Sequence, residues 1–209
     1  MKFIYLIMIS LLFSYCSSSP TKDEKPNNVE PTANVQKDDP KQKFLDLAYA
    51  TSKNIKDLSD KSIASKTKAL LNEAYVLLKL KKNEESIAKF EEAFEIGTDA
   101  EAYYKYGNAL SNTMKLEESI KAYDIALELG YEKEYNAIYN KGCSYSLLKN
   151  EEEAFKNILL AVDRGYTAIP YMEKDPDLSY IRSLPEWKSK YKEIKKHAKE
   201  REEVVKSKG

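Results

Sequence analysis

The sequence contains few of the residues that metal sites and nucleic-acid binding require. Its 209 residues include one histidine and two cysteines, whereas a zinc site built from these residue types needs four ligands. Its 34 lysines and arginines are balanced by 34 aspartates and glutamates, so the basic surface of a general nucleic-acid binder is not indicated. We therefore expect no metal, no other cofactor and no nucleic-acid partner.

Glycine and proline, which interrupt helices, are also scarce. The chain has six glycines and seven prolines, and four of the prolines lie together at positions 20, 26, 31 and 40. Beyond that stretch lysine, glutamate, leucine and alanine are abundant, and all four favour helix. Apolar residues make up 42% of the chain, which is enough to bury a core. The sequence therefore predicts an all-α fold.

Motifs of the common enzyme classes are missing from the sequence. No P-loop, dinucleotide-binding glycine pattern, Gly-x-Ser-x-Gly or HExxH motif occurs. The single histidine, His197, lies on a charged segment where no motif places an acid or a nucleophile beside it. Cys143 is interpreted as a small buried hydrophobe, with a reactive thiol as the alternative. The sequence predicts a protein that is not an enzyme and has no small-molecule substrate.

The N-terminal residues have the pattern of an export signal. Lys2 supplies a positive charge, and residues 3–13 form an apolar run with one polar break. That run is too short to span a bilayer, which takes about 20 residues, but it suits the apolar region of a secretory signal. Cys16 lies just beyond the run and is followed by three serines.

This arrangement resembles the signal peptide of bacterial lipoproteins, in which lipid is attached to the cysteine and the preceding peptide is removed. The resemblance implies a signal peptide at 1–15 and lipid on Cys16, although Tyr15 is bulky where the family has a small residue. The alternative is a plain secretory signal with an incidental cysteine. Ser17 rather than an aspartate follows the cysteine, which favours the outer membrane in bacteria that use the common sorting rule.

Residues 16–40 are predicted to form a flexible linker. They are rich in proline, serine and asparagine and contain almost no apolar side chains. Such a segment cannot offset its loss of conformational entropy by burying surface. With lipid on Cys16, the linker would hold a folded domain away from a membrane. Without lipid, it would be only a disordered N-terminus.

Three segments farther along the chain repeat one pattern, at spacings of 33 and 35 residues: 83–90, 116–123 and 151–158. A small residue precedes each segment, an alanine follows it, and a glycine closes each unit. In chain order these residues are Ala74, Gly107 and Gly142; Ala93, Ala126 and Ala161; and Gly97, Gly130 and Gly165.

Each unit of this period is interpreted as a pair of antiparallel helices. Small residues let the helices approach one another closely. Glutamates at the start of each second helix, such as Glu117 and Glu118, suit the positive end of the helix dipole. The closing glycines suit a left-handed helix cap. One unit cannot cover its own apolar face, so neighbouring units must stack.

The order of large, small and aromatic residues in these units resembles the tetratricopeptide repeat. In the middle unit the matching residues are Tyr103, Tyr106, Gly107, Leu110, Ser119, Tyr123 and Ala126. The resemblance covers about half of the chain and implies a solenoid of about three repeats, at 67–99, 100–134 and 135–166. Glu73 and Lys141 depart from the family pattern. An unrelated helical bundle is the alternative.

The segments on either side of the repeats are interpreted as helical caps. Residues 41–60 have an amphipathic pattern and are predicted to form an N-terminal capping helix. The repeat domain then extends over 41–166. Residues 167–209 are predicted to form a C-terminal helical cap and a charged tail.

Within the C-terminal cap, three apolar residues share one face of a predicted helix: Trp187, Tyr191 and Ile194. We expect this face to pack on the last repeat, because its residues follow helical spacing. Residues 195–209 are charged and are expected to fray. Their basic side chains are interpreted as a solvated helix end rather than a binding patch.

The family resemblance also implies where a ligand would bind. In tetratricopeptide repeat proteins the first helix of each pair lines a concave groove that holds an extended peptide or a partner helix. Asn108 and Asn140 fall where the family often uses asparagine to hold the ligand backbone. Carried over by repeat register, the groove-facing residues are Tyr75, Tyr104, Lys105, Asn108, Ser111, Tyr139, Asn140, Cys143 and Ser146.

Two functions are consistent with these features. The first is a membrane-anchored lipoprotein of the bacterial envelope that serves as an adaptor or assembly scaffold for a protein or peptide partner. The second is a surface-exposed lipoprotein that binds an external ligand. Both use the repeats for binding and Cys16 as the lipid anchor, and protease accessibility on intact cells would separate them.

Overall fold

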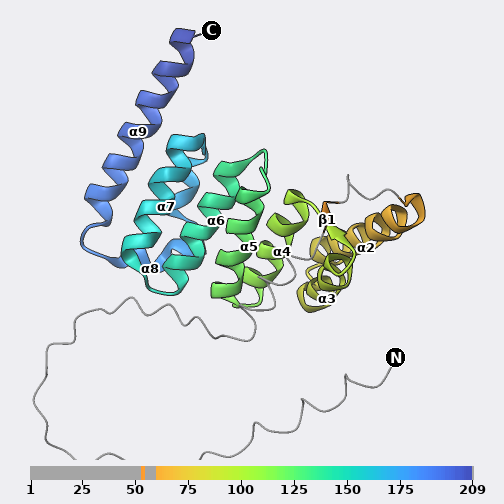
Figure 1. Ribbon diagram of the computed structural model, residues 1–209. Helices are drawn as coiled ribbons and strands as arrows, with labels where there is room; N and C mark the ends of the chain where they lie inside the picture. The colour runs from red at the N-terminus through yellow and green to blue at the C-terminus, as the bar shows by residue number, and fades with distance from the viewer. Residues whose placement is uncertain (1–52, 55–59, 209) are drawn as a thin grey trace, which may run out of the picture. The chain divides into compact units, whose positions relative to one another are not determined.

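The computed structural model describes residues 53–54 and 60–208, and this part of the chain is mostly helical (Figure 1). Three helix pairs follow one another, as the repeat pattern predicts. They are α2 (Lys61–Lys79) with α3 (Asn83–Phe94), α4 (Ala100–Asn112) with α5 (Leu116–Glu128), and α6 (Glu134–Leu147) with α7 (Glu151–Arg164). The all-α solenoid of three repeats is therefore confirmed.

The helix pairs stack in chain order. The second helix of each pair packs against the first helix of the next, α3 against α4 and α5 against α6. Within a pair, small residues permit close approach. A Cβ atom built on Gly107 would lie 2.6 Å from Cε1 of Tyr123, and one on Gly142 would lie 3.0 Å from Cδ1 of Ile158. At both glycines the two helices approach closely, as the sequence indicates, and the approach is closer at Gly107.

The turn inside each pair contains a left-handed residue that is not glycine. Lys81, Met114 and Lys149 all have φ of 60°, and they recur at the same repeat position. The second helix then begins with acidic residues in its first turn, including Glu84, Glu117 and Glu152. As predicted, these negative charges interact favourably with the positive end of the helix dipole. The residue types in the turn gave no sign of its left-handed conformation.

The closing glycines do not all behave alike. Gly130 and Gly165 have φ of 80° and 117°, so they end their repeats in the predicted left-handed conformation. Gly97 differs, because it lies in the two-residue strand β2 (Gly97–Thr98), which pairs in parallel with β1 (Lys53–Asn54). The left-handed cap expected at Gly97 is therefore wrong, and an extended backbone pair takes its place.

The predicted N-terminal capping helix, 41–60, is described only in part. Lys53–Asn54 form β1 rather than helix, since their backbone pairs with Gly97–Thr98. Asp60 caps α2, with its Oδ1 accepting a hydrogen bond of 2.8 Å from the backbone N–H of Ser62. The other residues of that prediction lie outside the described residues, as do the signal peptide at 1–15 and the linker at 16–40.

The C-terminal cap is built from four helical segments. These are η2 (Ile169–Glu173), η3 (Pro176–Leu178), α8 (Ser179–Ser183) and α9 (Trp187–Lys208). Helix α9 packs on α7, and Tyr191 and Ile194 are buried there, as predicted. The expected fraying of the tail is wrong for 195–208. Pairs four residues apart, such as Lys196 with Glu200 and Lys199 with Glu203, favour continued helix.

The buried residues form two clusters rather than one. The first is contributed mainly by α2 to α5, and the second by α6, α7 and the C-terminal cap. Between the clusters lie polar contacts, including a buried hydrogen bond of 2.8 Å between the Oγ atoms of Ser119 and Ser144. An ion pair of 2.6 Å joins Lys141 to Asp124 nearby.

Among the described residues, no helix combines the length and the apolar composition needed to cross a bilayer.

Candidate functional site

A hollow of about 420 Å³ lies along the first helices of the three repeats. Five of the residues predicted to face a groove line it: Lys105, Asn108 and Ser111 of α4, and Asn140 and Cys143 of α6. Sequence analysis missed the other lining residues, which are Leu78, Lys79, Lys81, Asn112, Tyr123 and Asp177.

The reasons for these omissions differ. Lys79 and Lys81 lie at the end of α2 and in the turn after it, just beyond the helical register that was carried over. Asp177 lies in the C-terminal cap, and no repeat pattern places a cap residue beside a groove. Leu78 could have been found from the sequence, because it lies at the repeat position of Ser111 and Ser146. Extending the register toward the turn would have added the two lysines and Asn112.

Two asparagines and a tyrosine hold one another at the centre of the hollow. The Oδ1 atom of Asn108 accepts hydrogen bonds from the Tyr123 hydroxyl at 3.0 Å and from the Asn140 Nδ2 at 2.9 Å. The same Nδ2 also donates to the Tyr104 hydroxyl at 3.4 Å. These bonds fix the orientation of both amides, and burial raises the pKa of Tyr123.

Both asparagines line the hollow, and each amide has one end without a hydrogen bond in the described part of the chain. Within residues 60–208, Nδ2 of Asn108 and Oδ1 of Asn140 form no hydrogen bond, while their other ends are fixed. A peptide backbone offers one N–H donor and one C=O acceptor per residue. The pair therefore presents one donor and one acceptor of the kind that an extended segment needs.

The two predicted aromatic contacts lie beside the hollow rather than in its lining. The Tyr104 ring stacks on Tyr131 with centroids 4.4 Å apart, and the ring of Tyr75 lies 5.6 Å from that of Phe90. Both side chains are half-buried. Burial, followed by the charges of Asp99 and Glu101, raises the pKa of Tyr75.

Three of the predicted groove residues are covered in the third repeat. Tyr139, Cys143 and Ser146 are buried. The Tyr139 hydroxyl donates a hydrogen bond of 2.6 Å to Oδ2 of Asp175, and its ring stacks on Tyr166 at 4.1 Å. The predicted exposure to a ligand is therefore wrong for Tyr139 and Ser146, because the C-terminal cap packs over this part of α6. Cys143 lines the hollow although it is almost fully buried.

Cys143 has the environment of an unreactive thiol. It is buried, and burial together with the nearby Asp175 and Asp177 carboxylates raises its pKa. The thiolate is the reactive form, so the interpretation as a small buried hydrophobe fits better than a reactive thiol. Ser146 is also fully buried, and its Oγ has no hydrogen-bond partner.

Within the described residues, one group brings three potential metal ligands together. Ligand atoms of Cys143, Asp175 and Asp177 lie within 4.8 Å of one another. Asp175 already accepts hydrogen bonds from the Tyr139 hydroxyl and the backbone N–H of Asp177. Burial and the charge of Asp175 also raise the pKa of Asp177. Asp175 is thus already engaged by protein donors, and the group carries no metal assignment.

His197 has an acidic neighbour that the sequence did not reveal. Its Nδ1 lies 2.9 Å from Oδ1 of Asp163, which joins α9 to α7. The pair lies at the exposed surface. It therefore explains how α9 docks on the last repeat.

Comparisons with known proteins bear on the repeats. Residues 100–129 match the family described as tetratricopeptide repeat, and these residues comprise α4 and α5. The comparison with curated proteins found no match. Among solved structures, a chain from the CopN-Scc3 complex is similar, with 20% identity and a TM-score of 0.46, covering 68% of this chain and 98% of that chain.

Proposed function

We propose that this tetratricopeptide repeat protein is a membrane-anchored lipoprotein of a bacterial envelope, and that it acts as an adaptor by binding an extended segment of a partner protein. The hollow along α2, α4 and α6 is the binding site. The observation that carries the proposal is the fixed pair of amides, Asn108 and Asn140, with a free donor and a free acceptor directed away from their mutual hydrogen bond.

The charges around the hollow favour one direction of binding. Lys79, Lys81 and Lys105 line it on the side of α2 and α4, whereas Asp177 lies on the side of α6. An extended segment with an acidic residue near the lysines and a basic residue near Asp177 would complement both ends. Binding should weaken as salt is added, because exposed charges are screened.

The proposed anchor rests on the sequence alone. Cys16 follows a short apolar run and precedes a proline-rich segment, an order that resembles bacterial lipoproteins. Two acyl chains hold a protein stably on a membrane, whereas one chain does so only weakly. A lipid on Cys16 would leave the repeats free to meet an envelope partner.

Site-specific crosslinking tests the binding site. A photoreactive side chain at Ser111 in the hollow should form an adduct with a partner in intact cells. The matched control is the same side chain at Glu117, which is exposed on the second helix of the same repeat. Equal adducts from both positions would contradict binding in the hollow.

Metabolic labelling with a fatty acid tests the anchor independently. The wild type should be labelled, and Cys16→Ser should not be. Cys143→Ser is the control, since Cys143 is the only other cysteine, and it should be labelled like the wild type. Label that survives Cys16→Ser would contradict the anchor without touching the binding site.

A further inference from the structure

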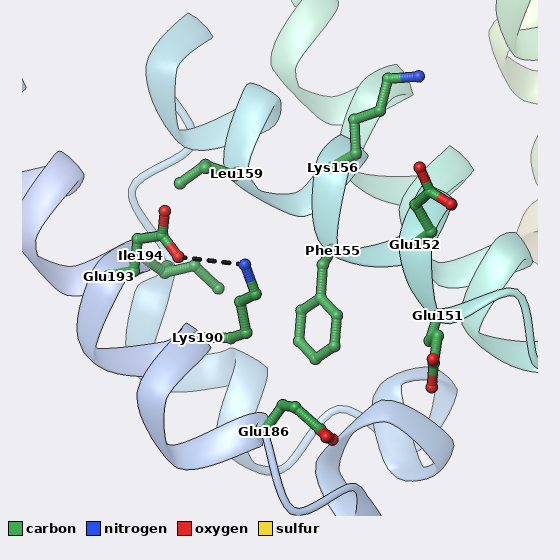
Figure 2. Close-up of a pocket in the computed structure, with 9 residues that line it drawn as sticks. All are labelled: Glu151, Glu152, Phe155, Lys156, Leu159, Glu186, Lys190, Glu193 and Ile194. Carbon is green, nitrogen blue, oxygen red and sulfur yellow. Dashed lines mark hydrogen bonds and ion pairs between the residues drawn. The ribbon is translucent and has the colours of Figure 1, made fainter.

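A second hollow, of about 370 Å³, lies between α7 and α9 and shares no residue with the first. We call it the α7–α9 pocket, and Figure 2 shows the residues that line it. Phe155 points into the space between the helices, with Leu159 and Ile194 completing an apolar floor. The ring of Trp187 lies 6.4 Å from that of Phe155. The floor is therefore stiffened by packed aromatic rings.

The repeat register shows why an apolar floor is unusual at this position. The residues equivalent to Leu159 are Glu91 in the first repeat and Asp124 in the second. Each binds the next repeat, Glu91 through the Tyr106 hydroxyl at 2.9 Å and Asp124 through the Lys141 ammonium at 2.6 Å. After the third repeat the acidic residue is replaced by leucine.

Helix α9 packs beside this leucine without closing the surface above it. Phe155 and Leu159 both remain partly exposed, although α9 buries Ile194 against α7. A pocket of a few hundred cubic ångströms with an apolar floor and polar groups around it has the usual form of a ligand site. The size suits one large apolar side chain rather than a whole helix.

The rim of the α7–α9 pocket carries excess negative charge. Lys190 is paired with Glu193 at 3.4 Å, and Lys156 is paired with Glu153 at 2.7 Å. The remaining rim carboxylates have no ion pair within residues 60–208; they are Glu151, Glu152 and Glu186. All three are exposed, so they remain available to an incoming cation.

We propose that the α7–α9 pocket binds a cationic segment of a partner protein, with one large apolar side chain on Phe155 and Leu159 and flanking lysines or arginines against the free glutamates. The acidic rim argues against an anionic membrane surface, which attracts basic rather than acidic segments. Because the two hollows are separate, one protein can hold two segments at once.

Fluorescence of Trp187 provides a direct measurement, because it is the only tryptophan in the chain and it lies beside the floor. The probe is an acetylated, amidated pentapeptide with a central leucine between two pairs of lysines. Added to the full-length protein at low salt, it should change the emission in a saturable way. The same peptide with glutamates in place of the lysines should not.

Matched substitutions separate the pocket from general attraction between charges. Glu151→Gln with Glu152→Gln should weaken binding roughly three- to tenfold, the scale of two exposed charge pairs. Glu117→Gln removes a charge at the repeat position equivalent to Glu152, and it should leave the affinity unchanged. Leu159→Asp restores the residue type of the second repeat and should abolish binding of the leucine peptide.

Four results would overturn the proposal. One is equal weakening by Glu117→Gln and the double variant. Another is unchanged affinity after Leu159→Asp, provided that circular dichroism shows the variant folded. A third is equal binding of a peptide with serine in place of the central leucine. The last is concentration-dependent dimerisation that Leu159→Asp removes, since this would assign the pocket to a second copy of the chain.

Discussion

The first helices of the second and third repeats, α4 and α6, carry equivalent residues in different surroundings. Tyr104 and Ser111 of α4 are partly exposed, whereas Tyr139 and Ser146, at the same repeat positions of α6, are buried. The difference comes from the segment around Asp175, which lies over α6 and accepts the Tyr139 hydrogen bond. A repeat position therefore fixes where a side chain points, while the neighbouring element decides whether a ligand can reach it.

Truncating the equivalent tyrosines should show the largest difference in stability between α4 and α6. Tyr139→Ala should lower the free energy of unfolding by about 3–5 kcal/mol, since it removes a buried ring and leaves a cavity. Tyr104→Ala should cost about 1–2 kcal/mol, because the ring is half-buried and loses mainly its stack on Tyr131. Urea denaturation measures both. Equal losses of stability in the two variants would mean that Tyr139 is no more buried than Tyr104.

The equivalent glycines should differ next. Alanine gains about 1 kcal/mol over glycine inside a helix, but overpacking costs about 1–3 kcal/mol. At Gly107 the new Cβ meets the buried ring of Tyr123 at 2.6 Å, whereas at Gly142 it meets Cδ1 of Ile158 at 3.0 Å and the backbone N of Ile158 at 3.2 Å. Gly107→Ala should therefore destabilise more than Gly142→Ala. Thermal melts that rank them in reverse would contradict this packing.

The two asparagines of the hollow should also behave differently. Asn108→Ala leaves the buried Tyr123 hydroxyl without its acceptor, at a cost of about 1–2 kcal/mol. Asn140→Ala removes only a partly exposed donor and should cost about 0.5 kcal/mol or less. Chemical denaturation of the two variants and of Tyr123→Phe with Asn108→Ala checks this. The double variant should lose no more than the single Asn108→Ala.

The smallest expected effect on stability is at Asp177, in the cap segment that packs on α6. Burial and the charge of Asp175 raise the pKa of Asp177 above its ordinary value of 3.8, so the folded state holds that proton more tightly than the unfolded state. The stabilisation is fully present below that ordinary value and is lost as pH rises through the folded pKa. At neutral pH, Asp177→Asn should thus stabilise by about 0.5 kcal/mol, a scale reduced by solvent screening.

Denaturant melts at several pH values measure this effect. The gain from Asp177→Asn should shrink as the pH falls from 7 toward 4, because the raised pKa lets the folded wild type take up the proton more readily than the unfolded chain. A gain in stability from Asp177→Asn that grows on acidification would contradict this prediction, because it would mean that the folded state stabilises the charged carboxylate of Asp177.

The helix pairs could be predicted from the sequence because their signals are local. Small residues at 107 and 142 and glutamates at the start of each second helix recur at fixed spacing. The i and i+4 lysine and glutamate pairs of α9 were equally visible, and they would have predicted the helix through residue 208. The left-handed turns at Lys81, Met114 and Lys149 could not be predicted, since helix packing rather than residue type imposes them.

The predicted groove residues match the hollow mainly where no distant segment covers them. Lys105, Asn108, Ser111 and Asn140 line the hollow because repeat register is sufficient to place them. Tyr139 and Ser146 failed because they are covered by a cap that comes later in the chain and whose fold carries no repeat pattern. Contacts between segments without a shared period cannot be read from spacing.

The division of the core into two clusters has a consequence for the order of folding. Every residue of the first cluster lies at or before Ala137, and the second cluster begins at Ile138. A chain emerges N-terminus first, from a ribosome or through a membrane pore, so the first cluster can close before the second is available.

The junction between the clusters is partly polar, which affects what the first cluster exposes when it closes early. The first cluster ends on a surface where Ser119 and Asp124 later bind Ser144 and Lys141, and water can satisfy those polar groups in the meantime. The junction also has an apolar part, because Leu127 packs against both clusters. The polar contacts therefore reduce, without removing, the apolar surface that a half-emerged chain exposes.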